Sequence, residues 1–417
     1  MTMDREQLRK WADAHADTVV DASSDRVRSL SSRLLRFRWQ GAPTVAIDSD
    51  ADGKTRINVV VDGLAYFLAT ATGADDTLNI ILGIDPATVE TPKIREHLDA
   101  IGTVAAHVTG GPRVKVWHIT DVVDEPKEVA PRAAQFSTPS PKRWAEMLNR
   151  AAVAPVDGLA MNLLVQADRP ALALYPKLSS KNEKLPWQLR LDGLDIGRVG
   201  PESGVLRLAS NLTAPGEPRV TWRDVVGKNA VPFTLKELPT VVVLIKELIV
   251  RWTKPLAGVL QHAQAEHALE AHILSGRLPL TAGGTRLHPA IATDDGALRV
   301  AQFPTLWGDV TRPARYLDAL LKDDEGRPWA VELKDQNAGG GHGAYLRHGV
   351  TQAVLYRHYI RSADALDAWF SARSLDRTEC QSALAFPDPS DGAAKTIGSL
   401  ELLAPLLDVC VIRFPRP

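Results

Sequence analysis

Apolar runs separated by turn residues mark the C-terminal part of the chain as a mixture of strands and helices. Residues 315–321 and 329–335 are two such runs, and the charged segment between them contains Gly326 and Pro328. Two runs joined in this way predict a β-hairpin. The elements expected around the hairpin are helices at 261–274, 346–361 and 397–407 and strands at 381–386 and 409–414.

The N-terminal part of the chain has a less regular pattern. Residues 4–39 have the spacing of a helix, and residues 91–101 form a second helical segment. Short apolar runs predict strands at 44–47, 57–61, 64–69, 78–82 and 113–119. The acidic segment 48–53 resembles the start of a calcium loop, but Val59 stands where the twelfth-position ligand is required. A tight hairpin turn is therefore expected there.

A proline-rich stretch at 124–143 predicts a linker between two parts of the chain. Residues 142–151 and 235–252 beyond it have helical patterns, and residues 161–222 are rich in strand-forming runs. The expected division is residues 1–135 as an N-terminal α/β domain, 136–255 as a strand-rich middle region and 256–417 as a C-terminal domain. The predicted fold class is mixed α/β, with a mixed sheet flanked by helices in the C-terminal domain.

The charge of the chain is unevenly distributed. The formal net charge of the 417 residues is −1, which does not by itself indicate a nucleic-acid-binding protein. Residues 141–254 carry 17 positive and 11 negative side chains, whereas residues 255–417 carry 16 and 19. The middle region is therefore a candidate phosphate-binding surface, although a solvated basic face has the same composition. The side chains proposed for this contact are Lys181, Lys184 and Arg190.

The chain has the features of a cytoplasmic protein. Its first residues are charged and lack the apolar segment of a signal peptide. The longest apolar stretch, 241–245, is interrupted by Lys246 and Glu247 and is too short to cross a bilayer. The two cysteines, Cys380 and Cys410, have the pattern of buried thiols. We expect a reducing compartment and no membrane partner.

Candidate chemistry is concentrated on the predicted hairpin. If the hairpin folds about Glu325, Asp318 lies opposite Glu332, and facing Cβ atoms are about 4.5–5.5 Å apart. Side chains alternate along a strand, so Lys334 shares a face with Glu332. Two carboxylates and an ammonium group would then converge, outside the core, on one patch.

Such a patch suits a divalent cation. Two adjacent carboxylates repel unless one is protonated or a cation lies between them. Mg²⁺ prefers hard oxygen ligands and is usually held by one or two carboxylates with water and phosphate. We therefore expect Mg²⁺ on Asp318 and Glu332, with Mn²⁺ as a substitute. Acid-x-Lys triplets also occur by chance, as at 52–54 and 125–127, and a solvated face of mixed charges is an ordinary alternative.

A helix follows this hairpin and carries Gln352 and Tyr356 four positions apart on one face. With these residues the last two-fifths of the chain resemble the PD-(D/E)XK nuclease superfamily, in particular its branches with a Gln-x-x-x-Tyr helix. The resemblance implies a restriction-endonuclease-like core with Asp318, Glu332, Lys334, Gln352 and Tyr356 in its active site. It also implies an upstream metal-binding glutamate, for which Glu270 is preferred and Glu266 is the alternative. Leu317 stands where the family name has proline.

The resemblance implies a metal-dependent endonuclease that hydrolyses phosphodiester bonds, with DNA as the expected nucleic acid. A role in bacterial restriction or antiviral defence follows only from the architecture, and a second subunit is a possible further source of positive charge. Two other interpretations remain open. One is a nucleic-acid- or nucleotide-sensing protein whose nuclease-like domain is not catalytic, and the other is an α/β scaffold.

Overall fold

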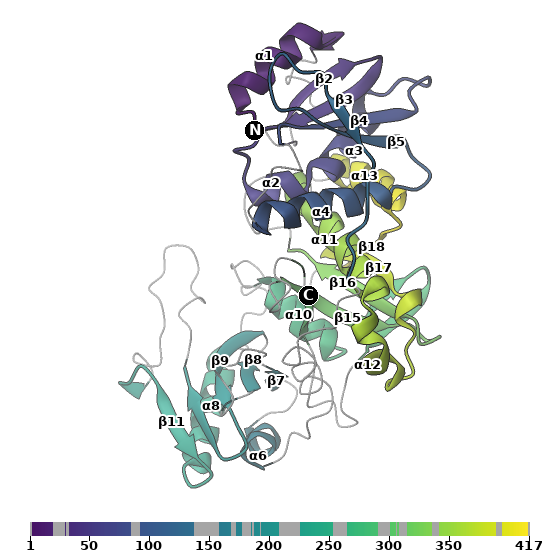
Figure 1. Ribbon diagram of the computed structural model, residues 1–417. Helices are drawn as coiled ribbons and strands as arrows, with labels where there is room; N and C mark the ends of the chain where they lie inside the picture. Colours follow the sequence, from purple (N-terminus) through teal and green to yellow (C-terminus); the bar gives the residue numbers. More distant parts are fainter. Residues whose placement is uncertain are drawn as a thin grey trace.

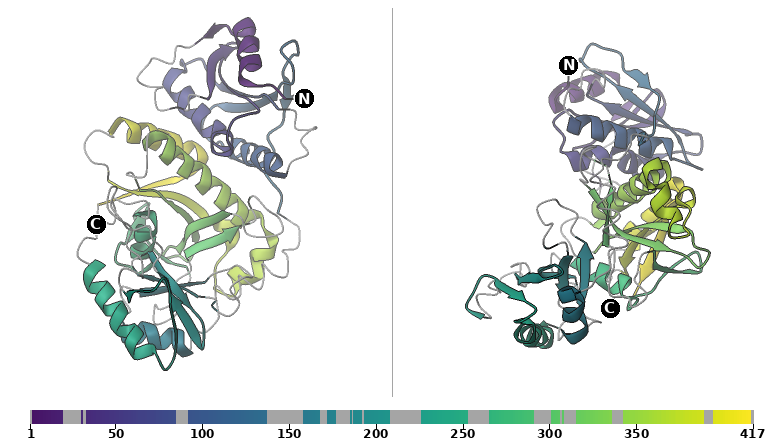
Figure 2. Two further views of the ribbon diagram at one scale, coloured as in Figure 1. Left: turned by 90° about the vertical axis from the view of Figure 1, so that its left-hand side faces the viewer. Right: turned by 60° about the horizontal axis from the view of Figure 1, so that its bottom comes forward.

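The structure is a computed structural model, and it describes residues 2–19, 30, 33–84, 92–136, 158–167, 172–176, 185, 187–191, 193–207, 226–252, 265–290, 301–305, 307, 315–335, 342–388 and 394–415. Within these residues the fold is mixed α/β with three separate sheets, which confirms the predicted class. Figure 1 shows the N-terminal sheet at the top, the C-terminal sheet in the centre and the middle region at the bottom, and both views in Figure 2 keep this order.

The N-terminal sheet is built around three parallel strands. Its order is β1-β2-β3-β4-β5-β6, with β3, β4 and β5 parallel and the outer pairs antiparallel. The strands are β1 (Thr18–Val19), β2 (Leu35–Trp39), β3 (Ala42–Ile47), β4 (Thr77–Leu82), β5 (Arg113–His118) and β6 (Lys127–Val129). The helices are α1 (Arg5–His15), α2 (Gly53–Ile57), α3 (Val59–Thr70) and α4 (Pro92–Ala106).

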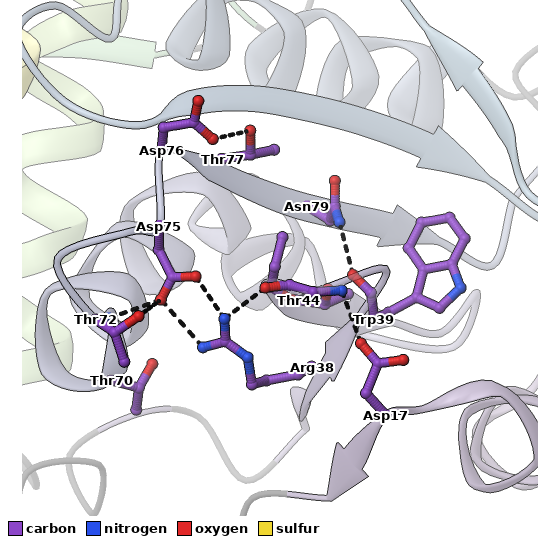
Figure 3. A network of polar contacts seen from close by, with 12 residues as sticks. Asp17, Arg38, Trp39, Thr44, Thr70, Thr72, Asp75, Asp76, Thr77 and Asn79 are labelled. Atoms are coloured by element: carbon purple, nitrogen blue, oxygen red, sulfur yellow. Dashed lines mark hydrogen bonds and ion pairs between the residues drawn. The ribbon is translucent and has the colours of Figure 1, made fainter.

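A polar network fastens the β2–β3 hairpin to the segment before β4 (Figure 3). Arg38 binds both carboxylate oxygens of Asp75, at 3.1 and 2.5 Å. Hydrogen bonds from Arg38 hold the pKa of Asp75 down, at about 2. The Asp17 carboxylate accepts from the amide of Gly41, a turn residue with φ 74°. The network lies at the edge of the sheet where the parallel strands β3 and β4 begin.

The segment after β3 differs from the sequence prediction. The predicted strands at 57–61 and 64–69 are wrong, because this stretch forms α2 and α3. The predicted hairpin at 48–53 is also wrong: the chain turns after β3 but continues into α2, and the Asp52 carboxylate accepts from the Thr55 amide at the start of that helix. The helix predicted at 4–39 ends at His15, and residues 35–39 form β2.

The middle region is an antiparallel sheet with two helices. Its strand order is β11-β10-β9-β8-β7. The strands are β7 (Leu172–Pro176), β8 (Trp187–Leu191), β9 (Leu194–Val199), β10 (Ser203–Leu206) and β11 (Val231–Thr234), and the helices are α6 (Gly158–Ala167) and α8 (Leu238–Trp252). The helix predicted at 142–151 lies outside the described residues.

The C-terminal sheet is mixed, as predicted. Its order is β12-β13-β15-β16-β17-β18, and β14 pairs with β15. Strands β15 and β16 are antiparallel, whereas β16, β17 and β18 are parallel. The strands are β12 (Leu280–Ala282), β13 (Thr285–Pro289), β14 (Ala301–Thr305), β15 (Arg315–Lys322), β16 (Pro328–Leu333), β17 (Gln381–Pro387) and β18 (Cys410–Phe414). The helices are α10 (Ala265–Leu274), α11 (His342–Ser362), α12 (Asp367–Ser371) and α13 (Ala394–Leu403), with short 3-10 turns η3 (Asp364–Leu366), η4 (Arg377–Glu379) and η5 (Ala404–Leu407).

Two helices cover the two faces of this sheet. Leu269 of α10 belongs to the core that contains Val331 and Leu333 of β16. Val350 of α11 belongs to the other core, with Ala330 of β16. Because neighbouring residues of a strand point to opposite faces, these contacts place α10 and α11 on opposite sides of β16.

The N-terminal and C-terminal parts share one hydrophobic core. Val60 and Leu64 of α3 lie in the same buried cluster as Leu346 and Val350 of α11. Figure 1 shows α3 and α4 beside α11 and α13. The three sheets lie within the three predicted segments, but the first and third segments are joined by apolar packing. No helix among the described residues is long and apolar enough to cross a membrane.

Candidate active site

The β15–β16 hairpin brings Asp318 and Glu332 to neighbouring positions. Ala319 pairs with Val331 in the antiparallel register, and the next position along it sets Asp318 opposite Glu332. The amide of Leu333 donates to Asp318 Oδ2 at 2.9 Å. This is the register that the sequence predicts, and it places the two carboxylates on one side of the hairpin.

The turn of the hairpin explains why the register is fixed. The carboxylate of Asp323 accepts hydrogen bonds from the amides of Glu325 and Arg327 and from Nε1 of Trp329. Gly326 has φ 82°, a conformation that favours glycine. A buried aspartate and a glycine thus set the length of the loop, and the loop length sets which residues face each other.

Lys334 lies at the centre of an acidic cluster. Its Nζ donates to Glu332 Oε1 at 2.6 Å, to Glu266 Oε1 at 2.8 Å and to the carbonyl oxygen of Leu333 at 3.0 Å. Glu332 and Lys334 are only 1% and 4% exposed, whereas Asp318 is partly exposed. The expectation that Glu332 and Lys334 lie outside the core is wrong, because the beginnings of α10 and α11 cover the end of β16.

The upstream helix contributes Glu266 to this cluster. Tyr345 of α11 donates its hydroxyl to Glu266 Oε1 at 3.1 Å, so Glu266 joins α10, β16 and α11. The preferred candidate Glu270 has different partners: its Oε2 lies 3.0 Å from Nδ1 of His267 and 3.6 Å from Nη1 of Arg190. Of the two alternatives, the structure therefore places Glu266 beside Lys334.

Two carboxylates of the cluster, those of Asp318 and Glu332, have raised pKa values. Burial raises the pKa of Glu332 to about 7, with Lys334 opposing the shift and Glu266 adding to it. Burial and then the charge of Glu332 raise the pKa of Asp318. Burial alone would lower the pKa of Lys334, but Glu332, Asp318 and Glu266 together raise it. The cluster is therefore short of positive charge.

The residues present fit a cation held by two carboxylates. Glu332 Oε2 is buried and accepts no hydrogen bond from a described residue. It and the Asp318 carboxylate offer hard oxygen atoms of the kind that Mg²⁺ prefers. Within the described residues no group of three or more His, Cys, Asp or Glu side chains is arranged to hold a metal ion. A cation here would therefore complete its coordination with water and substrate oxygens.

The helix predicted to support the site is α11. Nε2 of Gln352 donates to the hydroxyl of Tyr356 at 3.4 Å, and Gln352 Oε1 is buried with no hydrogen-bond partner among the described residues. Gln352 is partly exposed, whereas Tyr356 is 2% exposed and belongs to the core. Gln352 Oε1 could therefore accept a further hydrogen bond, whereas the Tyr356 ring packs in the hydrophobic core.

Tyr345 is a residue of the cluster that sequence reasoning missed. It precedes Gln352 by seven positions, so two helical turns place both on one face of α11. Gly349 lies between them on that face, and a Cβ atom there would be 3.0 Å from Cγ of Lys334. The seven-residue spacing of Tyr345 and Gln352 could have indicated from the sequence that Tyr345 faces the same site as Gln352.

Of the three basic residues predicted to contact phosphate, the structure describes only Arg190. Arg190 of β8 is 5% exposed and forms a buried ion pair with Glu270 of α10, so its guanidinium is not presented at the surface. Lys181 and Lys184 lie outside the described residues.

Comparisons of the chain with protein-family models, with curated proteins and with solved structures found no significant match. The fold and the site define only a class of protein. Its members would be mixed α/β chains of three sheets with a buried acid–lysine cluster at the end of a hairpin. Membership of the PD-(D/E)XK superfamily therefore stays an expectation from the sequence.

Proposed function

We propose that this protein is a metal-dependent nuclease that hydrolyses phosphodiester bonds, with DNA as its expected substrate. The observation that carries the proposal is the convergence of Asp318, Glu332 and Lys334 at the end of one hairpin. The repulsion between the Asp318 and Glu332 carboxylates and their burial cost folding free energy, and a cation bound between them would offset that cost.

Each residue has a distinct part in this proposal. Asp318 and Glu332 would hold Mg²⁺ or Mn²⁺, which when bound polarises a phosphoryl oxygen and lowers the pKa of a coordinated water. Lys334 would keep its proton, because the surrounding carboxylates raise its pKa, and would stabilise negative charge on the phosphate. Glu266 and Tyr345 would orient the Lys334 ammonium group.

The first experiment measures cleavage. Plasmid DNA, single-stranded DNA and RNA are incubated with the protein in Mg²⁺, in Mn²⁺ and in EDTA. Cleavage that needs the cation and is lost in Glu332→Gln supports the proposal. Absence of cleavage of all three substrates, or cleavage that persists in EDTA, contradicts it.

One observation favours a second candidate function. Lys334 already pairs with both Glu332 and Glu266, so the cluster has an internal counter-ion that could serve a purely structural role. The alternative is a nucleic-acid- or nucleotide-sensing protein whose nuclease-like domain is not catalytic. Salt-dependent DNA binding that is unchanged by Mg²⁺, without cleavage, would favour this alternative. A role in restriction or phage defence remains a proposal for either candidate.

A further inference from the structure

The cluster has three carboxylates, those of Asp318, Glu332 and Glu266, and one ammonium group, that of Lys334, and the N-terminal domain brings a second lysine close to it. The Nζ atom of Lys54 in α2 lies 5.7 Å from the centre of the Tyr345 ring, and the Nζ atom of Lys334 lies 5.3 Å from the same centre. Tyr345 is also the residue that donates to Glu266. A residue distant in sequence therefore borders the candidate active site.

Buried contacts fix the position of Lys54. Four residues further along the chain, Asn58 Oδ1 lies 3.0 Å from Nδ1 of His348. Asp62 then forms an ion pair with Arg347 at 2.5 Å, with both side chains buried. These contacts attach the start of α3 to the same turn of α11 that carries Tyr345, so α2 and its lysine are held beside the cluster.

Lys54 is more exposed than the neighbouring basic side chains, which are buried and already hydrogen-bonded. Arg56 is buried and donates to the carbonyl oxygens of Ser49 and Ala51, and Arg347 is occupied by Asp62. Lys54 is exposed, and among the described residues its ammonium group contacts the ring of Tyr345. An exposed ammonium group over an aromatic ring remains available to an anion.

We propose that Lys54 binds a backbone phosphate of the nucleic-acid strand that is cleaved, so that the N-terminal domain forms part of the substrate site. This inference rests on the proposed nuclease function. The ammonium groups of Lys54 and Lys334 are at most about 11 Å apart, because both flank one ring. One strand of duplex DNA carries a phosphate about every 3.4 Å of helix axis, so this upper bound places the two ammonium groups within about three nucleotides of each other. Lys334 would serve the phosphate that reacts, and Lys54 a phosphate a few nucleotides away.

The experiment measures the affinity of the full-length protein for labelled duplex DNA in Ca²⁺, with salt varied from 50 to 200 mM. Lys54→Ala removes one phosphate contact, so the slope of log K against log salt should become shallower by about 0.9. Lys54→Glu should weaken binding further, and Lys54→Arg should restore most of it. The matched control is Lys10→Glu, because Lys10 is an exposed lysine on α1 whose partner is Glu6.

Cleavage kinetics give the second readout. A phosphate-binding role predicts that Lys54→Ala raises KM more than it lowers kcat, with the melting temperature unchanged. An unchanged salt slope in Lys54→Ala and Lys54→Glu, while Glu332→Gln abolishes cleavage, overturns this inference and leaves the nuclease proposal standing. An equal loss of affinity in Lys10→Glu also overturns it, because the effect would then be one of net charge. Absence of DNA binding and cleavage in the parent protein overturns both proposals.

Discussion

At the scale of single residues, the site combines features that could and could not be foreseen. The register of Asp318 and Glu332 was predictable, because a turn with glycine and proline defines a hairpin and alternation fixes its faces. The contact between Glu266 and Lys334 was not predictable, because it depends on where the beginning of α10 lies against the sheet. Helical spacing alone does not distinguish Glu266 from Glu270.

Substitutions of Glu332 and Lys334 should have different effects on stability. Lys334→Ala should lower the free energy of unfolding of the metal-free protein by about 3–5 kcal/mol, because it leaves buried carboxylates without their cation. Glu332→Gln should cost much less, since burial already favours the neutral form of that side chain. Both variants should lose cleavage. Denaturant unfolding and plasmid cleavage measure the two effects, and equal destabilisation by the two variants would contradict the assigned electrostatics.

The stability of the metal-free protein should fall as the pH rises from 5 to 8. The pKa of Glu332 in the folded protein is about 7, above its ordinary value of 4.5. A raised pKa means that the stabilising contribution is fully present below about pH 4.5 and is lost as the pH rises through 7. Thermal unfolding across this range tests the trend.

Two controls isolate Glu332 in that measurement. Glu332→Gln should flatten the fall in melting temperature, because the amide does not titrate. Saturating Ca²⁺ should reverse the trend, because bound cations require deprotonated carboxylates. A fall of the same size in Glu332→Gln would show that another group is responsible.

At the scale of elements, the sequence predicted the C-terminal part of the chain better than the N-terminal part. The strands at 381–386 and 409–414 and the helix at 346–361 follow the predicted pattern. The segment 57–69 did not, because α3 is covered by the N-terminal sheet and by α11. Val59, Val60 and Val61 are all fully buried, so no polar face interrupts the apolar run. A short β-branched run of this kind cannot be distinguished from a buried strand by periodicity.

The approach of α11 to the sheet requires glycine at 349. A Cβ atom there would be 2.5 Å from Cδ1 of Leu384 and 3.0 Å from Cγ of Lys334. Gly349→Ala should therefore destabilise the protein by about 1–3 kcal/mol and reduce cleavage by displacing Lys334. Gly398→Ala in α13 is the matched control, because nothing lies within 4 Å of its Cβ position. The control should stabilise the helix by about 0.5–1 kcal/mol, and the same gain in Gly349→Ala would refute the close approach.

The packing of the middle region on α10 makes a further prediction. A Cβ atom on Gly193 would be 2.2 Å from the carbonyl oxygen of His267, so the β8–β9 turn lies directly against α10. Arg190→Ala would leave Glu270 buried without this counter-ion and should lower stability by about 3–5 kcal/mol. The salt slope of DNA binding should stay unchanged. A flatter slope with unchanged stability would instead return Arg190 to the role of phosphate contact.

At the scale of the whole molecule, the first and third parts of the chain form a continuous structure. The buried cluster of α3 and α11 is shared, and Phe136 packs on Trp307 and Tyr359 at ring distances of 5.0 Å. The sequence indicated a linker at 124–143, which contains Phe136, because this stretch is rich in proline. The contacts that join the two parts link residues far apart in the sequence, such as Phe136 and Tyr359. Local sequence patterns contain no information about such contacts.

The ion pair of Asp62 and Arg347 tests this continuity. Burial raises the pKa of Asp62 in spite of Arg347, so the pair itself contributes little net stability. Asp62→Ala nevertheless leaves the buried Arg347 uncompensated and should cost about 3–5 kcal/mol. The double variant Asp62→Leu with Arg347→Met should recover most of that loss, and unfolding should remain a single transition when followed by tryptophan fluorescence and by circular dichroism.

Cleavage by the same two variants tests whether the contact between α3 and α11 affects the candidate active site. Because Arg347 lies two residues after Tyr345 on α11, loosening α3 in Asp62→Ala should displace both Lys54 and Tyr345 and raise the KM for DNA. The double variant restores the packing of α3 on α11 and should restore the KM together with the stability. Two separate unfolding transitions in the parent protein, or a KM that is normal in Asp62→Ala, would show that the N-terminal domain is an independent unit beside the C-terminal domain.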